Sequence, residues 1–207
     1  MGKQEIIIAI LVTVAGGLLL DLVKNGFAVT KKVFKKIAGL LPSKFHLRKR
    51  SRLLLFLSSG GTCRDPMAKT ITERVLQGLS LPFKVRIEAM ALGPLSKDCV
   101  SYGARNAIKQ IYGEDLLVRH VPTRATREIL DEADLILVMD RSLLMSKILP
   151  PQKSYLLKEF FGLSGDITDP WPDGRDQATL SRYRECAEEM KSIIEGNADR
   201  LVQALQS

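Results

Sequence analysis

Short apolar runs alternate along this chain with stretches in which apolar residues recur every three to four positions. The run LLLFL at 53–57 is continuous and short, as in a parallel strand buried on both faces. Similar runs predict further strands at 85–92, 116–121 and 134–139. The stretch 155–161 fits either type of element. Helical spacing predicts helices at 66–79, 98–112, 126–133, 140–149 and 177–205. Strands that alternate with helices indicate an α/β fold with a doubly wound, four-stranded parallel sheet.

An apolar stretch at 6–23 contains no charge except Asp21, near its end. A helix that crosses a bilayer needs about 20 mostly apolar residues, so this stretch is long enough only if Asp21 lies among the headgroups. Three interpretations are open: a cleaved signal peptide, a buried helix of a soluble protein, and a membrane anchor. The dense lysines and arginines that follow favour the anchor, because basic flanks mark the cytoplasmic side.

Residues 24–51 combine basic side chains with apolar ones at near-helical spacing. The apolar positions are Phe27, Val29, Val33, Phe34, Ile37, Leu40 and Leu41. This pattern fits a basic amphipathic helix on anionic lipid, or a solvated juxtamembrane helix. The sequence thus predicts an apolar anchor helix (1–23), a basic juxtamembrane segment (24–51) and a cytoplasmic globular domain (52–207).

The net charge of +8 belongs to the N-terminal part of the chain. Eleven lysines and arginines face two acidic residues within 1–52, so the remainder is close to neutral. This distribution argues against a nucleic-acid-binding surface on the globular domain. Three cysteines and two histidines, without a CxxC pair or a cluster, argue against a disulfide framework or a zinc site. We expect no metal and no cofactor.

A glycine-containing loop, SSGGTCR, follows the first strand at 58–64 and leads into a helix. Asp65 is suited to cap that helix and Pro66 to begin it. The order of strand, loop and helix directs backbone N–H groups and the positive end of a helix dipole at the loop. The loop also lies beyond the carboxyl end of a strand, where doubly wound sheets bind ligands. The pattern therefore predicts a binding site for an oxyanion such as phosphate.

Three separated motifs resemble the low-molecular-weight protein tyrosine phosphatases, a family that includes related arsenate reductases. The family motif is an apolar strand followed by Cys-x5-Arg, then Ser or Thr and Pro. Here Ser58 stands at the cysteine position and Arg64 follows six residues later. The segment ADLILVMDR at 133–141 resembles the fourth-strand signature, and DITDP at 166–170 resembles the general-acid loop. The resemblance covers the chain from Arg52 onward and implies a flavodoxin-like strand order.

The resemblance implies roles for the loop residues and for two residues far along the chain. Family members attack phosphorus with a thiolate, at the position of Ser58 here, while Arg64 holds the phosphoryl oxygens bidentately. Asp169 would protonate the leaving phenolate and then activate water. Trp171 is placed to stack on a phosphotyrosine ring, with ordinary packing as the alternative. The other substrate-binding positions are Ser59, Gly60, Gly61, Thr62, Cys63 and Asp65.

Two positions depart from the family pattern in ways that bear on activity. Ser58 carries a hydroxyl that stays protonated near neutral pH, and no histidine lies at a motif position to act as its base. Asp65 replaces the hydroxyl residue that steadies the thiolate, and it brings negative charge near the phosphate. Ser58 is explained either by an engineered Cys→Ser substitution that traps ligand without turnover or by natural loss of the cysteine, which would give a phosphate-binding pseudoenzyme. The retained Arg64 and Asp169 favour the substitution, and Asp65 favours natural divergence.

These observations lead to three hypotheses of function. The first is a membrane-tethered phosphatase that acts on phosphotyrosine proteins and is inactive, or traps its ligand, with Ser58. The second is a pseudophosphatase that binds a phosphorylated or other anionic partner without turnover. The third is an arsenate reductase, for which Cys63 and Cys99 would have to relay a disulfide.

Overall fold

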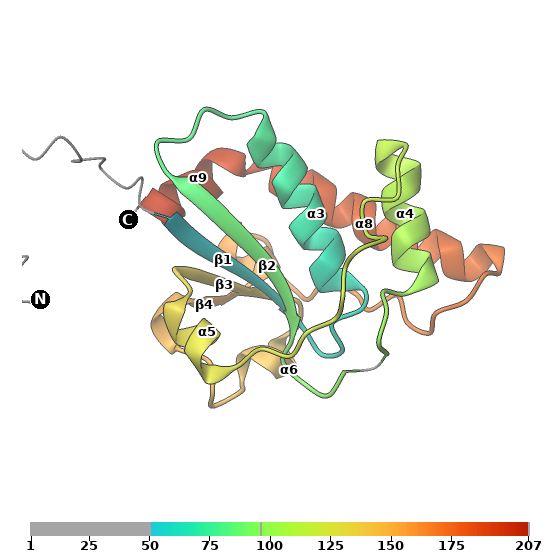
Figure 1. The fold of residues 1–207 in the computed structure, drawn as a ribbon, viewed down its shortest axis with the longest axis horizontal. Helices are drawn as coiled ribbons and strands as arrows, with labels where there is room; N and C mark the ends of the chain where they lie inside the picture. The colour runs from blue at the N-terminus through green and yellow to red at the C-terminus, as the bar shows by residue number, and fades with distance from the viewer. Residues whose placement is uncertain (1–50, 96, 207) are drawn as a thin grey trace, which may run out of the picture. The chain divides into compact units, whose positions relative to one another are not determined.

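A parallel four-stranded sheet is the centre of the computed structural model, which describes residues 51–95 and 97–206 (Figure 1). The spatial order of the strands is β2-β1-β3-β4. Their bounds are β1 Ser51–Ser58, β2 Lys84–Ala91, β3 Leu135–Val138 and β4 Ser154–Leu156. The doubly wound α/β fold with a flavodoxin-like order is thereby confirmed.

Helices cover both faces of the sheet, which explains why β1 is apolar without interruption. Leu54 and Phe56 point into one core, whereas Leu55 and Leu57 point into the other. The first core is closed by α3 Arg64–Gln77, α4 Tyr102–Tyr112, α8 Gln177–Gly196 and α9 Ala198–Gln206. The second is closed by α5 Arg127–Glu132 and α6 Arg141–Leu144. After β3, the chain also forms the 3₁₀ helix η1 Pro151–Lys153 and the short helix α7 Leu157–Phe160.

The register of the strands brings three loops to one edge of the sheet. Ser58, the last residue of β1, is paired with Ala91 at the end of β2. Leu57 is likewise paired with Val138 at the end of β3. The chain therefore leaves all three strands at the same carboxyl edge, where ligands bind in this class of fold.

The predicted strand at 116–121 is wrong. This stretch forms a turn, in which the side chains of Val118 and Val121 are 60% and 69% exposed. Because neither valine is buried, the apolar pattern there does not mark a sheet position. The fourth strand is β4, which overlaps the start of the stretch at 155–161 whose type the pattern left open, and α7 follows within that stretch.

The predicted helices differ from the observed ones mainly at their ends. The C-terminal helix is interrupted at Asn197, whose φ of −132° ends α8 and whose side chain donates to the Ile193 carbonyl. The predicted helix at 140–149 is helical only over α6, where Asp140 accepts a hydrogen bond from the Leu143 amide.

The proposed membrane anchor and most of the basic segment, residues 1–50, lie outside the described part of the chain. Among the helices of residues 51–95 and 97–206, none combines the length and the apolarity needed to cross a bilayer.

Candidate functional site

The loop between β1 and α3 is closely fitted to the end of β2. The Leu92 amide donates to the Ser58 carbonyl at 2.8 Å, and the Gly93 amide donates to the Ser59 carbonyl at 3.1 Å. Gly61 has a φ of +73°, and a Cβ there would lie 3.1 Å from the Cβ of Ala91. A glycine at position 61 is therefore required both by the backbone conformation and by the space available.

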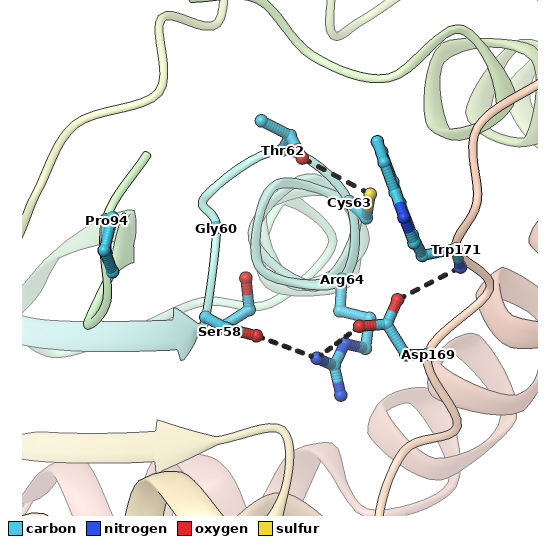
Figure 2. A pocket seen from close by; sticks show the side chains of 9 residues that line it. Ser58, Gly60, Thr62, Cys63, Arg64, Pro94, Asp169 and Trp171 are labelled. Atoms are coloured by element: carbon cyan, nitrogen blue, oxygen red, sulfur yellow. Dashed lines mark hydrogen bonds and ion pairs between the residues drawn. The ribbon is translucent and has the colours of Figure 1, made fainter. Parts of the chain in front are cut away.

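This loop forms the floor of a pocket of about 260 Å³ (Figure 2). The pocket is lined by Ser58, Ser59, Gly60, Thr62, Cys63, Arg64, Pro94, Asp169 and Trp171. The structure thus brings together eight of the ten residues that the sequence predicts for the site. The other two, Gly61 within the loop and Asp65 in the first turn of α3, are buried and do not line the pocket.

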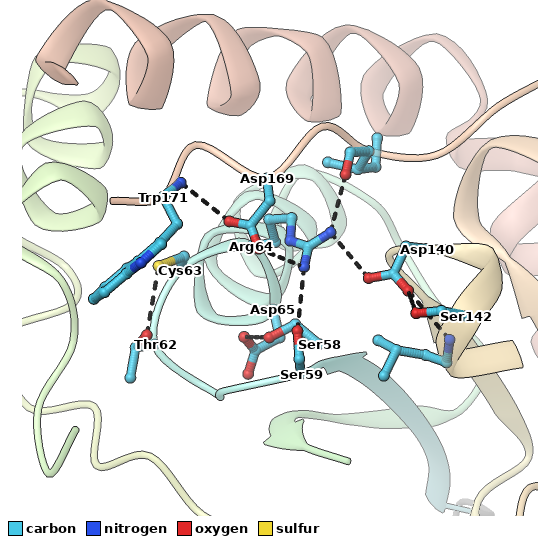
Figure 3. Close-up of polar contacts among 12 residues, drawn as sticks. Ser58, Ser59, Thr62, Cys63, Arg64, Asp65, Asp140, Ser142, Asp169 and Trp171 are labelled. Atoms are coloured by element: carbon cyan, nitrogen blue, oxygen red, sulfur yellow. Dashed lines mark hydrogen bonds and ion pairs between the residues drawn. The ribbon is translucent and has the colours of Figure 1, made fainter. Parts of the chain in front are cut away.

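Arg64 is the buried cation of the pocket, with a side chain only 4% exposed. One terminal nitrogen donates to the Ile167 carbonyl at 3.0 Å and lies 3.1 Å from Asp140 Oδ2. The other lies 2.9 Å from Asp169 Oδ2 and 3.5 Å from Ser59 Oγ (Figure 3). These contacts hold the guanidinium across the mouth of the loop, between the ends of β1 and β3.

Asp169 and Trp171 approach the pocket from the loop that precedes α8. Asp169 Oδ1 accepts a hydrogen bond from the Trp171 amide at 3.1 Å, while its other oxygen faces Arg64. The indole of Trp171 is 47% exposed, and the Lys97 ammonium lies 5.1 Å from its ring centroid. The indole is thus accessible at the pocket mouth, where the Lys97 ammonium forms a cation–π contact with it.

The loop that carries Asp169 is fixed on both sides of it. Upstream, the Ile167 amide donates to the Met139 carbonyl at 2.9 Å. Downstream, the Asp173 carboxylate accepts hydrogen bonds from the amides of Tyr102 and Gly103 at the start of α4. Burial acts to raise the pKa of Asp173, but the hydrogen bonds from Gly103, Lys97 and Tyr102 outweigh it and hold the pKa below its usual value.

Asp65 is not the N-cap of α3, as the sequence predicted, because the helix begins at Arg64 and Cys63 occupies the N-cap position. The Asp65 carboxylate turns instead toward the loop, where its Oδ1 accepts a hydrogen bond from Ser58 Oγ at 2.6 Å. Burial raises the pKa of Asp65 to about 7, against the opposing effects of the Ser58 hydrogen bond and the Arg64 charge.

Cys63 is held in a buried network that links the loop to α4 and α8. Its Sγ lies 2.9 Å from Ser101 Oγ and 3.4 Å from Tyr183 Oη. Burial raises the pKa of the thiol above its usual value, so the neutral form is favoured. Cys63 therefore combines hydrogen bonding and packing, rather than supplying a thiolate.

Comparison with known proteins agrees with this geometry. The sequence profile described as "Low molecular weight phosphotyrosine protein phosphatase" matches residues 53–207. The chain belongs to the low-molecular-weight protein tyrosine phosphatase family. The match covers the sheet, the pocket loop and the loop that carries Asp169, as the resemblance of the sequence motifs implied.

Three relatives illustrate the range of the family. A low-molecular-weight protein tyrosine phosphatase from T. tengcongensis is 30% identical, with a TM-score of 0.61 over 74% of this chain and 99% of that one. A protein-arginine-phosphatase of Bacillus subtilis (strain 168) is 24% identical over 155 residues, which are 72% of this chain and 95% of the relative. A cysteine-to-serine mutant of an arginine phosphatase, with a phosphorylated active-site serine, is 23% identical, with a TM-score of 0.59 over 75% of this chain and 96% of that one.

Several members of the site were not predicted from the sequence. Pro94 forms part of the pocket wall, and Asp140 pairs with Arg64 from the end of β3. Burial lowers the pKa of His120, and its interaction with the Gly61 backbone opposes this shift. Asp140 lies within the segment 133–141 that resembles the fourth-strand signature, but its pairing with Arg64 was not predicted, and Pro94 and His120 belong to loops without a motif.

Proposed function

We propose that this phosphatase-family domain binds the phosphoryl group of a phosphotyrosine protein and that Ser58 makes it a trapping form or a very slow enzyme. The observation that carries the proposal is the meeting of Arg64 and Asp169, 2.9 Å apart, over a loop that ends at a helix N-terminus. A guanidinium with backbone N–H groups suits a tetrahedral dianion, and an adjacent carboxylic acid suits a leaving oxygen.

Ser58 accounts for the limited turnover. It occupies the position from which family members attack phosphorus, but an alcohol is a poor nucleophile unless a base takes its proton. A seryl phosphate, once formed, has an alkoxide leaving group that departs less readily than a thiolate. The phosphorylated serine described for the arginine-phosphatase mutant supports the idea that a serine in this loop can carry a phosphoryl group.

The aromatic side of the pocket supports an aryl phosphate as the ligand. Trp171 offers a half-exposed indole at the mouth, and Pro94 adds an apolar surface. Phosphoarginine is the second candidate, because two relatives are protein-arginine-phosphatases. Its guanidinium would be attracted to the Asp169 carboxylate, whose side chain is 48% exposed.

Calorimetry on the full chain tests the binding step. We expect inorganic phosphate, arsenate and a phosphotyrosine peptide to bind, and Arg64→Ala to abolish binding. Phosphoarginine in place of phosphotyrosine decides between the two substrate classes. If neither phosphate nor either phosphorylated ligand binds, or if Arg64→Ala changes nothing, the proposal is wrong.

A pseudophosphatase that only recognises a phosphorylated partner is the alternative, since Asp65 adds a negative charge beneath the phosphate site. Hydrolysis of an aryl phosphate after Ser58→Cys would favour a phosphatase ancestry for the site. If the Ser58→Cys protein folds and binds phosphate but shows no hydrolysis, the pseudophosphatase is favoured.

A membrane tether is a separate part of the proposal, supported by the apolar stretch 1–23 and the basic segment 24–51. We expect the full chain to sediment with cell membranes and to resist extraction with alkaline carbonate. Release by salt alone would indicate binding to anionic lipid surfaces without a span.

A further inference from the structure

The Ser58 hydroxyl is hydrogen-bonded to a buried acid. Ser58 Oγ lies 2.6 Å from Asp65 Oδ1, and Asp65 has no exposed surface (Figure 3). Its second oxygen, Oδ2, has no hydrogen-bond partner within the described residues. A carboxyl group is thus enclosed beneath the phosphate site, and its side chain is directed at the oxygen in the nucleophile position.

The surroundings of the Ser58 oxygen favour loss of its proton toward Asp65. The Gly61 amide donates to the same oxygen from 3.3 Å. The hydroxyl proton of Ser58 can therefore point at the Asp65 carboxylate. The N-terminus of α3, a helix of 14 residues, begins six positions after Ser58 and stabilises negative charge nearby. The Gly61 hydrogen bond and the helix N-terminus both stabilise the negative charge that the oxygen gains as it loses its proton.

This pairing suits a hydroxyl nucleophile and not a thiolate. A carboxylate next to a cysteine would oppose ionisation of the thiol by repulsion. A serine, in contrast, needs a base that takes its proton during attack. The pKa of Asp65, raised by burial to about 7, allows the carboxyl both to accept and to return a proton near neutral pH.

We infer that Asp65 is the general base that activates Ser58 for phosphoryl transfer, an inference that rests on the proposed phosphate-binding function. Ser58 Oγ attacks phosphorus and its proton moves to Asp65. The bond from phosphorus to the leaving oxygen breaks, and that oxygen takes its electron pair and a proton from Asp169. The products are a seryl phosphate, a neutral Asp65 and a free phenol.

The same step explains why the seryl phosphate persists. Neutral Asp65 no longer repels the phosphate dianion beside it, so the phosphorylated form is favoured electrostatically. Hydrolysis requires water to attack phosphorus, Asp169 to take the proton of that water and Asp65 to return its proton to Ser58 Oγ. Because the serine oxygen departs less readily than a thiolate, we expect the chain to accumulate phosphoserine at position 58.

The test is to incubate the full chain with p-nitrophenyl phosphate and to follow phosphorylation of Ser58 by intact-protein and peptide mass spectrometry. We expect Asp65→Asn to slow phosphorylation about a hundredfold or more, as for loss of a general base. The rate for the parent should rise with pH as Asp65 ionises, and this rise should be missing in Asp65→Asn. Inorganic phosphate should bind the variant at least as tightly as the parent, because one nearby carboxylate is removed.

Asp131→Asn is the matched control, because it makes the same chemical change at an exposed position of α5. If Asp65→Asn fails to fold by circular dichroism, Asp65→Ser gives the same comparison. Equal phosphorylation rates in the parent and a folded Asp65 variant would overturn the inference. It would also be overturned if the parent binds phosphate through Arg64 but never forms phosphoserine. Loss of phosphate binding in the parent would instead refute the proposed function, and the inference with it.

Discussion

Arg64 and Asp169 lie 105 positions apart in the chain and form an ion pair of 2.9 Å at the mouth of the pocket. A phosphate dianion must share the guanidinium with this carboxylate and is repelled by it. We predict that Asp169→Asn tightens the binding of inorganic phosphate about fivefold, since a half-exposed ion pair is worth up to about 1 kcal/mol. Calorimetry on the full chain measures this. Weaker binding by a folded variant would show that Asp169 supports the anion.

Placing the cysteine of the family motif at position 58 gives a second prediction. Ser58→Cys should hydrolyse p-nitrophenyl phosphate measurably, because a thiol ionises far more readily than an alcohol. Adding Asp65→Ser should raise the rate further, since the buried carboxylate no longer opposes the thiolate. Adding Asp169→Ala instead should lower kcat about a hundredfold or more, as for loss of a general acid. A double variant with Asp65→Ser that is slower than Ser58→Cys alone would contradict this account of Asp65.

Gly61 and Gly113 allow a matched test of the loop geometry. Both have a positive φ, +73° and +79°, but only Gly61 is crowded by a neighbour, Ala91. We predict that Gly61→Ala lowers the free energy of unfolding by about 2–4 kcal/mol, from backbone strain and overpacking together. Gly113→Ala should lower it by about 1 kcal/mol, from strain alone. Urea unfolding of the two variants measures both, and equal losses would argue against a crowded loop.

The stability of the domain should depend on the ionisation of Asp65. The pKa is about 7 in the folded state and near 3.8 when exposed, so the folded state holds this proton more tightly. The contribution to stability is therefore complete below pH 4 and is lost as the pH rises to 7, by up to about 4 kcal/mol. Asp65→Asn removes this dependence.

Comparing the parent with the Asp65→Asn variant also removes the effect of His120 on the pH dependence of stability. Burial lowers the pKa of His120, so its contribution has the opposite sign, but it is the same in parent and variant. Urea titrations at pH 4 to 8 give the difference in unfolding free energy. A difference that stays constant over this range would mean that Asp65 is ionised throughout.

The pocket loop could be predicted because its signals are local. A continuous apolar run, two glycines and a proline predict a strand, a turn and a helix start between Leu53 and Pro66. The structure has β1, the loop and the start of α3 in this order. The turn at 116–121 shows where a local pattern fails. Leu117 is buried there but Val118 and Val121 are not, and only the packed fold decides which apolar residues face inward.

The partners of the site residues were harder to predict than the residues themselves. Asp65 is of a residue type that often caps helices. Only its hydrogen bond with Ser58 Oγ shows that its carboxylate faces the loop. The contact of Cys63 with Tyr183 spans 120 positions and depends on how α8 packs on α3 and α4. Such contacts arise from the tertiary arrangement, which no spacing along the chain encodes directly.

The anchoring of Ile167 to the end of β3 and of Asp173 to the start of α4 has a consequence for recognition. The carboxylate and the indole between these two points are presented in place before any ligand arrives. We therefore expect a ligand to enter without a closing motion of this loop, and ligands of different shape to be distinguished by rigid fit and by side-chain rotation. Association with a small anion should accordingly be a single-step process, without a slow phase that is independent of ligand concentration.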